Sequence, residues 1–119
     1  MKGFFTLNRE LFSHPIWQTS TPEQKVILIT LIGMMNHSSS KWIWKGAEIE
    51  VKRGQRITTV AEIVKTCGKG ISEKNVRTAL KKFEKFNFLA NQWAPEGHLI
   101  TIENYNKWQS MFLETGRPT

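Results

Sequence analysis

The sequence contains a single cysteine, Cys67, among its 119 residues. An intramolecular disulfide is therefore excluded, and the composition suits a reducing compartment, so we expect a cytoplasmic protein. The opening stretch MKGFFTLNRE lacks the apolar core and the cleavage site of a signal peptide. The longest apolar run is too short to span a bilayer, so we expect no membrane partner.

Motifs for catalysis and for metal binding are also missing from the sequence. The histidines at positions 14, 37 and 98 are scattered, and no Cys/His spacing suits zinc. Gly68-Lys69-Gly70 lacks the length and the trailing residues of a phosphate-binding P-loop. There is no nucleophile elbow and no paired-carboxylate motif. We therefore predict that the protein is not an enzyme and that it uses no metal or cofactor.

Negative charge is scarce, with 10 acidic residues against 17 Lys and Arg and a net charge of +7. The excess is local, because residues 41–85 hold 12 Lys and Arg against five Glu, whereas the remaining residues hold five of each sign. Such a local excess is typical of a phosphate-binding surface. The length and the 39% apolar content predict one domain over residues 1–112 and a linker-like tail over 113–119.

Residues 58–102 carry the clearest structural pattern. Thr59 and Glu62 have the spacing of a helix capping box, and Gly68 lies where a helix usually ends. A second helix is predicted to begin at the N-cap Ser72, after a short glycine turn. Its basic outer face carries Lys74, Thr78, Lys81 and Lys85, flanked by Arg77 and Lys82. Its buried stripe comprises Val76, Ala79, Leu80 and Phe83.

Two strand-like segments, Phe88–Trp93 and His98–Ile102, follow the second helix and flank a turn. Two helices around a glycine turn, followed by a hairpin, predict an α+β, mainly helical fold, a winged helix-turn-helix with a C-terminal β-hairpin wing. An additional small N-terminal hairpin is predicted over Trp42–Val51, and a short strand over Arg56–Thr58. Core packing against the helices is expected for Trp42 and Trp44, although tryptophans also stack on unpaired bases.

The N-terminal part is predicted to be helical and apolar. Thr21 and Gln24 form a capping box for a central core helix that ends near Asn36. A short helix over Arg9–Ser13 is expected to be stopped by Pro15. The aromatic and aliphatic residues of the segment Gly3–Gln18 either pack on the domain's own core or form a self-association surface. The candidates for self-association are Phe4, Phe5, Leu11, Phe12 and Trp17.

Four stretches together resemble one known family. They are GFFTLNRELFSHPIWQ, WIWKGAEIEVKRGQRITT, ISEKNVRTALKKFEK and LITIENYNKWQ, which span nearly the whole chain. The chain resembles the amino-terminal domain of phage replisome-organiser proteins, which are related to the DnaD-like primosomal proteins of low-GC Gram-positive bacteria. The KRGQ turn and the ENYNKWQ stretch are the specific features, because many winged-helix transcription regulators share the helix pattern.

The resemblance implies an origin-binding or primosome-loading role in replication initiation, in the bacterial cytoplasm. It implies double-stranded DNA and further copies of the chain as partners. A helicase loader or other primosome proteins would bind through a region absent from this chain. By position, Ser72–Lys85 would be the recognition helix and Gln92–His98 the wing.

For duplex DNA we expect the second helix to enter the major groove with its N-terminal half nearest the bases. Arg77 would then pair with guanine and Asn75 with adenine. The wing tip carries Glu96 but no Lys or Arg, so we expect a small electrostatic contribution from it. The candidate DNA contacts are Lys69, Ser72, Lys74, Asn75, Arg77, Thr78, Lys81, Lys82, Lys85, Gln92, Trp93 and His98.

Three other functions fit the sequence. A transcriptional regulator with the same fold would protect promoters from cleavage and leave an origin unprotected. A winged helix used only as an oligomerisation or protein-docking module would show no salt-sensitive affinity for DNA. A single-strand binder that uses Trp42, Trp44 and Trp93 would show tryptophan quenching by oligo-dT.

Overall fold

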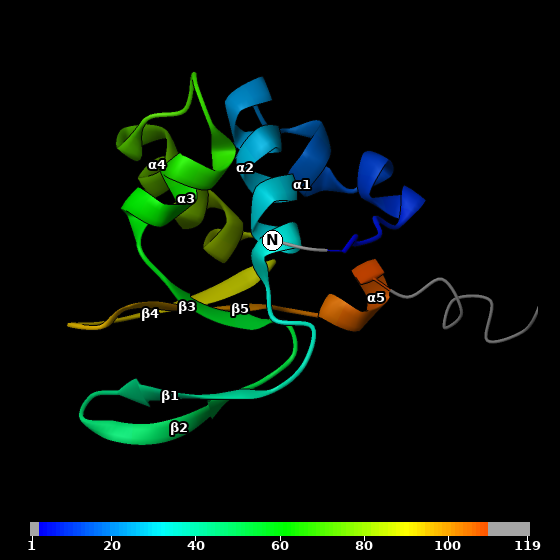
Figure 1. The fold of residues 1–119 in the computed structure, drawn as a ribbon. Coiled ribbons are helices and arrows are strands. Elements are labelled where there is room, and N and C mark those ends of the chain that lie inside the picture. The colour runs from blue at the N-terminus through cyan, green and yellow to red at the C-terminus, as the bar shows by residue number, and fades with distance from the viewer. Residues whose placement is uncertain (1–2, 110–119) are drawn as a thin grey trace, which may run out of the picture.

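The protein is an α+β fold in which helices lie above one face of a three-stranded sheet and a hairpin lies below it (Figure 1). The computed structural model describes residues 3–109, so Phe112 and the predicted tail over 113–119 lie outside the described residues. No helix within the described range has the length and apolar character to cross a membrane. In chain order the elements are the 3-10 helix η1 (Arg9–Ser13), α1 (Pro15–Gln18), α2 (Pro22–Met34), β1 (Ser40–Trp44), β2 (Ala47–Val51), β3 (Gln55–Thr58), α3 (Val60–Cys67), α4 (Glu73–Lys85), β4 (Leu89–Ala94), β5 (Gly97–Ile102) and α5 (Tyr105–Gln109).

Both sheets are antiparallel. β5 lies at the centre of the three-stranded sheet, between β3 and β4, and β1 pairs with β2 alone. Trp44 pairs with Ala47, and Ala94 pairs with Gly97, so two-residue turns close both hairpins. The α+β class, the two hairpins and the short strand β3 are therefore confirmed.

The three-stranded sheet separates two apolar clusters, because successive side chains of a strand point to opposite faces. In β5, Ile100 and Ile102 belong to the main core with α2 and α4, whereas Leu99 packs with Trp44 and Val51 of the β1–β2 hairpin. The predicted stripe of α4 is buried in the main core, since each of its four residues is at most 4% exposed. The sheet thus fixes the position of α4 relative to the β4–β5 hairpin.

Of the three predicted helix caps, two form as the sequence indicates and the third, at α3, forms only in part. The box of Thr21 and Gln24 forms at the start of α2 as predicted. At α3 the backbone N–H of Glu62 donates to Thr59 Oγ1, but the Glu62 carboxylate does not return a hydrogen bond to Thr59. It accepts instead from Arg56 and from Thr58. The predicted box at α3 is therefore only half formed, because β3 offers stronger donors to the carboxylate.

One prediction about the N-terminal half is confirmed and one is wrong. The short helix over Arg9–Ser13 forms as η1 with Asn8 as its N-cap and ends before Pro15, as predicted. Pro15 itself occupies the first turn of a separate short helix, α1, where proline costs no hydrogen bond. His14 caps that turn, with its Nδ1 accepting from the Ile16 backbone N–H at 3.1 Å. The central helix α2 is not covered on every side, since Val26 is 43% exposed.

The two specific stretches of the family resemblance pack against each other. Arg53 Nε donates to Asn106 Oδ1 at 2.8 Å, and its guanidinium lies 5.1 Å from the ring centroid of Tyr105. Gly54 has a φ of +83°, and a Cβ built there would lie 2.7 Å from Tyr105 Cβ. The backbone N–H of Ile102 donates to the Gly54 carbonyl at 3.0 Å. The KRGQ turn and the ENYNKWQ stretch are therefore one structural contact that joins β3 to α5.

We predict a coupling between Gly33 and Phe5, because the Phe5 ring fills the space that a side chain at Gly33 would need. A Cβ at Gly33 would lie 2.6 Å from Phe5 Cε1. Gly33→Ala should stabilise the Phe5→Ala protein by about 1 kcal/mol, the helix-propensity gain. In the wild-type background the gain should be smaller or reversed, because the ring must move. Urea denaturation of the four proteins gives the coupling free energy, and a value near zero would contradict the contact.

We also predict that Glu62 makes stability depend on pH. Burial favours its neutral form, but hydrogen bonds from Thr58 and Arg56 and the charges of Arg56 and Lys65 outweigh burial and lower the pKa of Glu62 below its ordinary value of 4.5. A lowered folded-state pKa means stability that is present above pH 4.5 and lost as the pH falls through the folded-state pKa. Glu62→Gln should therefore reduce the loss of unfolding free energy between neutral and acidic pH.

Urea denaturation at neutral pH and at about pH 3.5 measures this loss. The exposed Glu50→Gln on β2 is the matched control. An equal loss in wild type and Glu62→Gln would show that this carboxylate is not responsible. The effect is expected to be modest, because the side chain of Glu62 is 42% exposed and that of Arg56 is 34% exposed.

Candidate nucleic-acid interface

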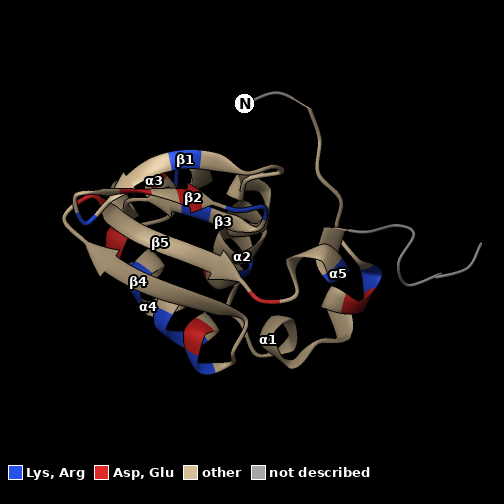
Figure 2. Ribbon diagram, turned by 90° about the horizontal axis from the view of Figure 1, so that it is seen from below, with Lys and Arg blue, Asp and Glu red and all other residues tan. Residues whose placement is uncertain are grey.

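The outer surface of α4 forms a basic strip along most of the helix. The exposed cationic and hydroxyl residues of this surface, which we call the α4 basic face, are Lys74, Arg77, Thr78, Lys81 and Lys85, and the acidic Glu73 and Glu84 of the same helix are also exposed. The residues of the α4 basic face share one side of the helix because the opposite stripe is in the main core. Figure 2 shows blue Lys and Arg segments on α4, whereas the neighbouring β4 and β5 carry none. Lys69 extends the basic surface into the exposed turn between α3 and α4.

The start of α4 engages two of the predicted contact residues. The backbone N–H of Asn75 donates to Ser72 Oγ at 3.0 Å, and the backbone N–H of Ser72 donates to Asn75 Oδ1 at 2.9 Å. Recognition of adenine by asparagine uses both amide groups, and here the oxygen is occupied. Because its side chain completes a helix cap, Asn75 could read adenine only if the cap opened, and that contact stays a prediction.

Arg77 forms an ion pair within α4. Its NH2 atom lies 2.8 Å from Glu73 Oε1, and the two side chains are 59% and 52% exposed. Pairs of this kind at i and i+4 are worth only a few tenths of a kcal/mol. The pair therefore positions the guanidinium on the surface without preventing it from exchanging partners.

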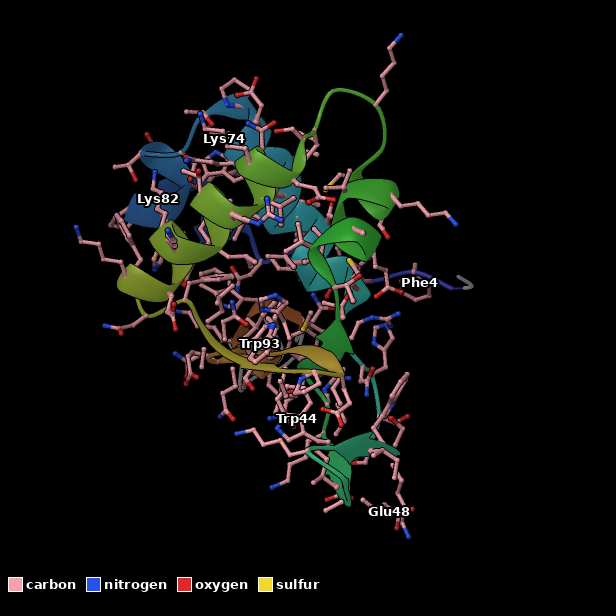
Figure 3. All side chains as sticks on the ribbon, turned by 90° about the vertical axis from the view of Figure 1, so that its left-hand side faces the viewer. Phe4, Trp44, Glu48, Lys74, Lys82 and Trp93 are labelled. Atoms are coloured by element: carbon pink, nitrogen blue, oxygen red, sulfur yellow. The ribbon has the colours of Figure 1, made fainter. Side chains whose placement is uncertain are left out.

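Lys82 does not belong to the α4 basic face. Its Nζ donates to the Thr19 backbone carbonyl and, at 3.3 Å, to Gln24 Oε1. It also lies 5.7 Å from the Phe86 ring centroid. Figure 3 shows Lys82 beside the N-terminal helices. Its ammonium ties α4 to the α1–α2 connection, so a phosphate would have to replace these partners, and the phosphate contact of Lys82 stays a prediction.

The β4–β5 hairpin presents Gln92 and Trp93 to solvent, and Trp93 is 67% exposed. His98 is half-buried, and its Nδ1 lies 3.0 Å from Asn91 Oδ1. Burial, and to a lesser degree the charge of Arg77, lowers the pKa of His98 below 6.5. His98 is therefore close enough to α4 to respond to its charge.

The tip of the β4–β5 hairpin meets the turn of the β1–β2 hairpin. The Glu96 carboxylate accepts hydrogen bonds from the backbone N–H groups of Lys45, of Glu96 itself and of Gly46. These hydrogen bonds, together with the charge of Lys45, lower the pKa of Glu96 despite its slight desolvation. The two hairpin tips lie side by side in both ribbon views (Figures 1 and 2). Lys45 is thus a cation at this tip that sequence reasoning missed, and no local signal could have placed it there.

The aromatic N-terminal segment divides between core and surface. Leu11 is 1% exposed, so the expectation that it belongs to a self-association surface is corrected, whereas Trp17 packs on the main core but stays partly exposed, and its role remains a prediction. Phe5 lies over Gly33. Phe4 is 85% exposed beside an apolar hollow of 340 Å³. Phe12, at 57% exposure, contacts Trp17 edge-on with ring centroids 5.3 Å apart.

The tryptophans of β1 differ in environment. Trp44 is 7% exposed, but it packs with Val51 and Leu99 in the second cluster, which contains no helix residue, so the expected packing against the helices is wrong for it. Trp42 is 50% exposed beside the exposed Ile43. The expectation of core packing is also wrong for Trp42, because the second cluster is too small to cover its ring. Because Trp44 is buried, it cannot stack on unpaired bases.

Comparisons with models of known protein families, with characterised proteins and with solved structures find no significant match to the chain.

Proposed function

We propose that the protein is a winged-helix domain that binds duplex DNA in replication initiation. The observation that carries the DNA-binding part is the α4 basic face, whose cations project from a helix that is anchored by a fully apolar opposite stripe. An exposed helix with this charge matches the shape and the phosphate charge of a major groove. Replication, as opposed to transcription, rests on the family resemblance of the sequence.

The topology supports the winged-helix assignment. The order α2, β3, α3, α4, β4, β5 gives a three-helix unit with a β-hairpin directly after its last helix. β3 completes the sheet beside β5, in the order β3-β5-β4. In this assignment α4 is the recognition helix and the β4–β5 hairpin is the wing.

The α4 basic face suggests how a duplex is held. Lys74, Arg77 and Thr78 lie in the N-terminal half of α4, which would be nearest the base edges. Lys81 and Lys85 lie one and two turns further along and would reach phosphates, as would Lys69 from the turn. The electrostatic attraction does not depend on base sequence, so the domain should also bind random duplexes.

Fluorescence anisotropy of a labelled random duplex at several salt concentrations tests this function. Five exposed cations, Lys69, Lys74, Arg77, Lys81 and Lys85, predict a log–log salt slope of about −4 to −5. Absence of duplex binding at low salt would contradict the proposed DNA-binding function. Footprinting on an origin and on a promoter then separates a replication initiator from a transcriptional regulator.

Self-association is a second proposed property, favoured by the exposed Phe4 and Phe12. Both rings lie in the N-terminal segment, on elements other than α4 and the β4–β5 hairpin. Contiguous exposed apolar patches mark contact surfaces, whereas single exposed side chains are common, so the proposal depends on Phe4 together with the apolar hollow of 340 Å³ beside it. Sedimentation velocity of wild type and Phe4→Ser/Phe12→Ser tests it, and identical sedimentation of the two proteins as monomers would exclude these rings as an interface.

A further inference from the structure

A groove of 220 Å³ runs between α4 and the β4–β5 hairpin. Its apolar lining comes from Val60 at the start of α3 and from Leu80 of α4. Its polar lining comes from three elements: Arg77, Lys81 and Glu84 of α4, Asn91 of β4, and His98 of β5. Cationic and amide groups from separate elements therefore converge on one concave site.

We propose that this groove is a binding site for one phosphodiester group of the DNA backbone, held jointly by Arg77, Lys81 and the imidazolium form of His98. The inference rests on the proposed function and deepens it, because it assigns one phosphate to one site and makes binding take up a proton. A phosphate oxygen accepts hydrogen bonds only, so it selects donors and positive charge.

The hydrogen bond inside the groove defines the state of the histidine. Asn91 Oδ1 can only accept, so His98 Nδ1 at 3.0 Å carries the proton and donates it. The neutral ring therefore keeps an unprotonated Nε2, which repels a phosphate oxygen. Protonation turns Nε2 into a charged donor without disturbing the bond to Asn91.

Arg77 can exchange its present partner for a phosphate in the groove. Its ion pair with Glu73 is exposed on both sides and therefore weak, so exchange of the carboxylate for a phosphate costs little. Arg77 also acts on His98 directly, because its charge contributes to lowering the pKa of the imidazole in the absence of a ligand. A phosphate between the two would offset that repulsion and raise the pKa of His98.

Glu84 is the one acidic residue among the described residues that line the groove. Its carboxylate repels a bound anion. Because Glu84 lies at the far end of the α4 lining, the phosphate is expected in the part of the groove near Arg77 and Lys81. Glu84→Gln should consequently raise affinity for DNA about threefold, less than a full phosphate contact is worth.

The sign of the pH effect follows from linkage. The pKa of His98 is higher with phosphate bound than without it, so the added affinity is fully present below the unliganded pKa and is lost as the pH rises through the liganded one. Affinity of wild type for a random duplex should fall about tenfold from pH 5.5 to pH 8 near 0.1 M salt, the value of one phosphate contact.

The test compares wild type with His98→Gln and with the matched control His37→Gln, which removes an exposed histidine outside the groove. Anisotropy titrations at pH 5.5 and pH 8 should show the tenfold change in wild type and His37→Gln and its loss in His98→Gln. In parallel, the NMR titration of the wild-type His98 ring should give a higher pKa with duplex than without it.

The outcomes separate the two proposals. Salt-sensitive binding with equal pH dependence in wild type and His98→Gln, or a His98 pKa that the duplex leaves unchanged, overturns the phosphate site and leaves DNA binding intact. Absence of binding at both pH values overturns both. If His98→Gln does not fold, the NMR titration of the wild-type protein decides alone.

Discussion

Replacement of Lys74 and Lys81 by alanine together is expected to lower the affinity for a random DNA duplex about 100-fold near 0.1 M salt. Each lost phosphate contact removes about 0.9 from the log–log salt slope, which at 0.1 M is nearly tenfold in affinity, so two contacts amount to roughly 2.5 kcal/mol. Both side chains are exposed on α4, whose buried stripe is untouched by the change. The protein should therefore remain folded while its salt slope falls by about two.

The matched control is Lys41→Ala/Lys52→Ala. It removes the same two charges from the exposed surface of the β1–β2 hairpin and its following turn, away from α4. If overall charge alone attracted DNA, both double variants would lose the same affinity. Equal losses in the anisotropy titrations would therefore rule out α4 as the recognition helix, whereas a loss confined to Lys74→Ala/Lys81→Ala would support it.

The largest expected effect on stability comes from Gly54→Ala. The residue has a φ of +83°, where a side chain is strained, and its Cβ would lie 2.7 Å from Tyr105 Cβ. Tyr105 is 5% exposed and begins α5, so neither it nor the strand end at Ile102 can move freely. Strain and overpacking together predict a loss of about 2–5 kcal/mol in unfolding free energy and a fall in Tm of roughly 10 °C or more.

Gly46→Ala separates the two causes. Gly46 has a φ of +80°, but a Cβ there meets nothing within 4 Å. This variant should lose only the backbone term, about 1–2 kcal/mol. Thermal unfolding followed by circular dichroism compares the two proteins. Equal destabilisation would mean that the contact with Tyr105 contributes nothing and that the close approach of the KRGQ turn to α5 is not needed for folding.

Local features of the fold could be predicted from the sequence. The start of α2, the buried stripe of α4 and the two-residue hairpin turns depend on residues within about one helical turn or one β-turn of each other. Asn75 belongs to the same class. Its spacing from Ser72 is that of a capping box, so the sequence already contained the signal that its side chain would be used at the helix start.

Other outcomes depend on residues that lie far apart in the chain. Lys82 binds the Thr19 carbonyl across 63 positions of the chain, and Lys45 reaches Glu96 across 51. Leu11 looked like a surface candidate because nothing within its own segment covers it, yet it is buried in the main core. The periodicity of apolar residues does not predict such contacts, because it shows only which side of a helix or strand is apolar.

The sequence by itself therefore determined α2, α3 and α4, the hairpins and the sign and location of the charge, because each follows from neighbouring residues, whereas α1 was not predicted. Only the tertiary structure decided which cations remain on the surface. It placed Lys82 against the N-terminal helices and left Lys74 and Lys81 exposed. It also brought His98 of β5 to Arg77 of α4, because the sheet packs under the helices and sets the distance between helix and hairpin.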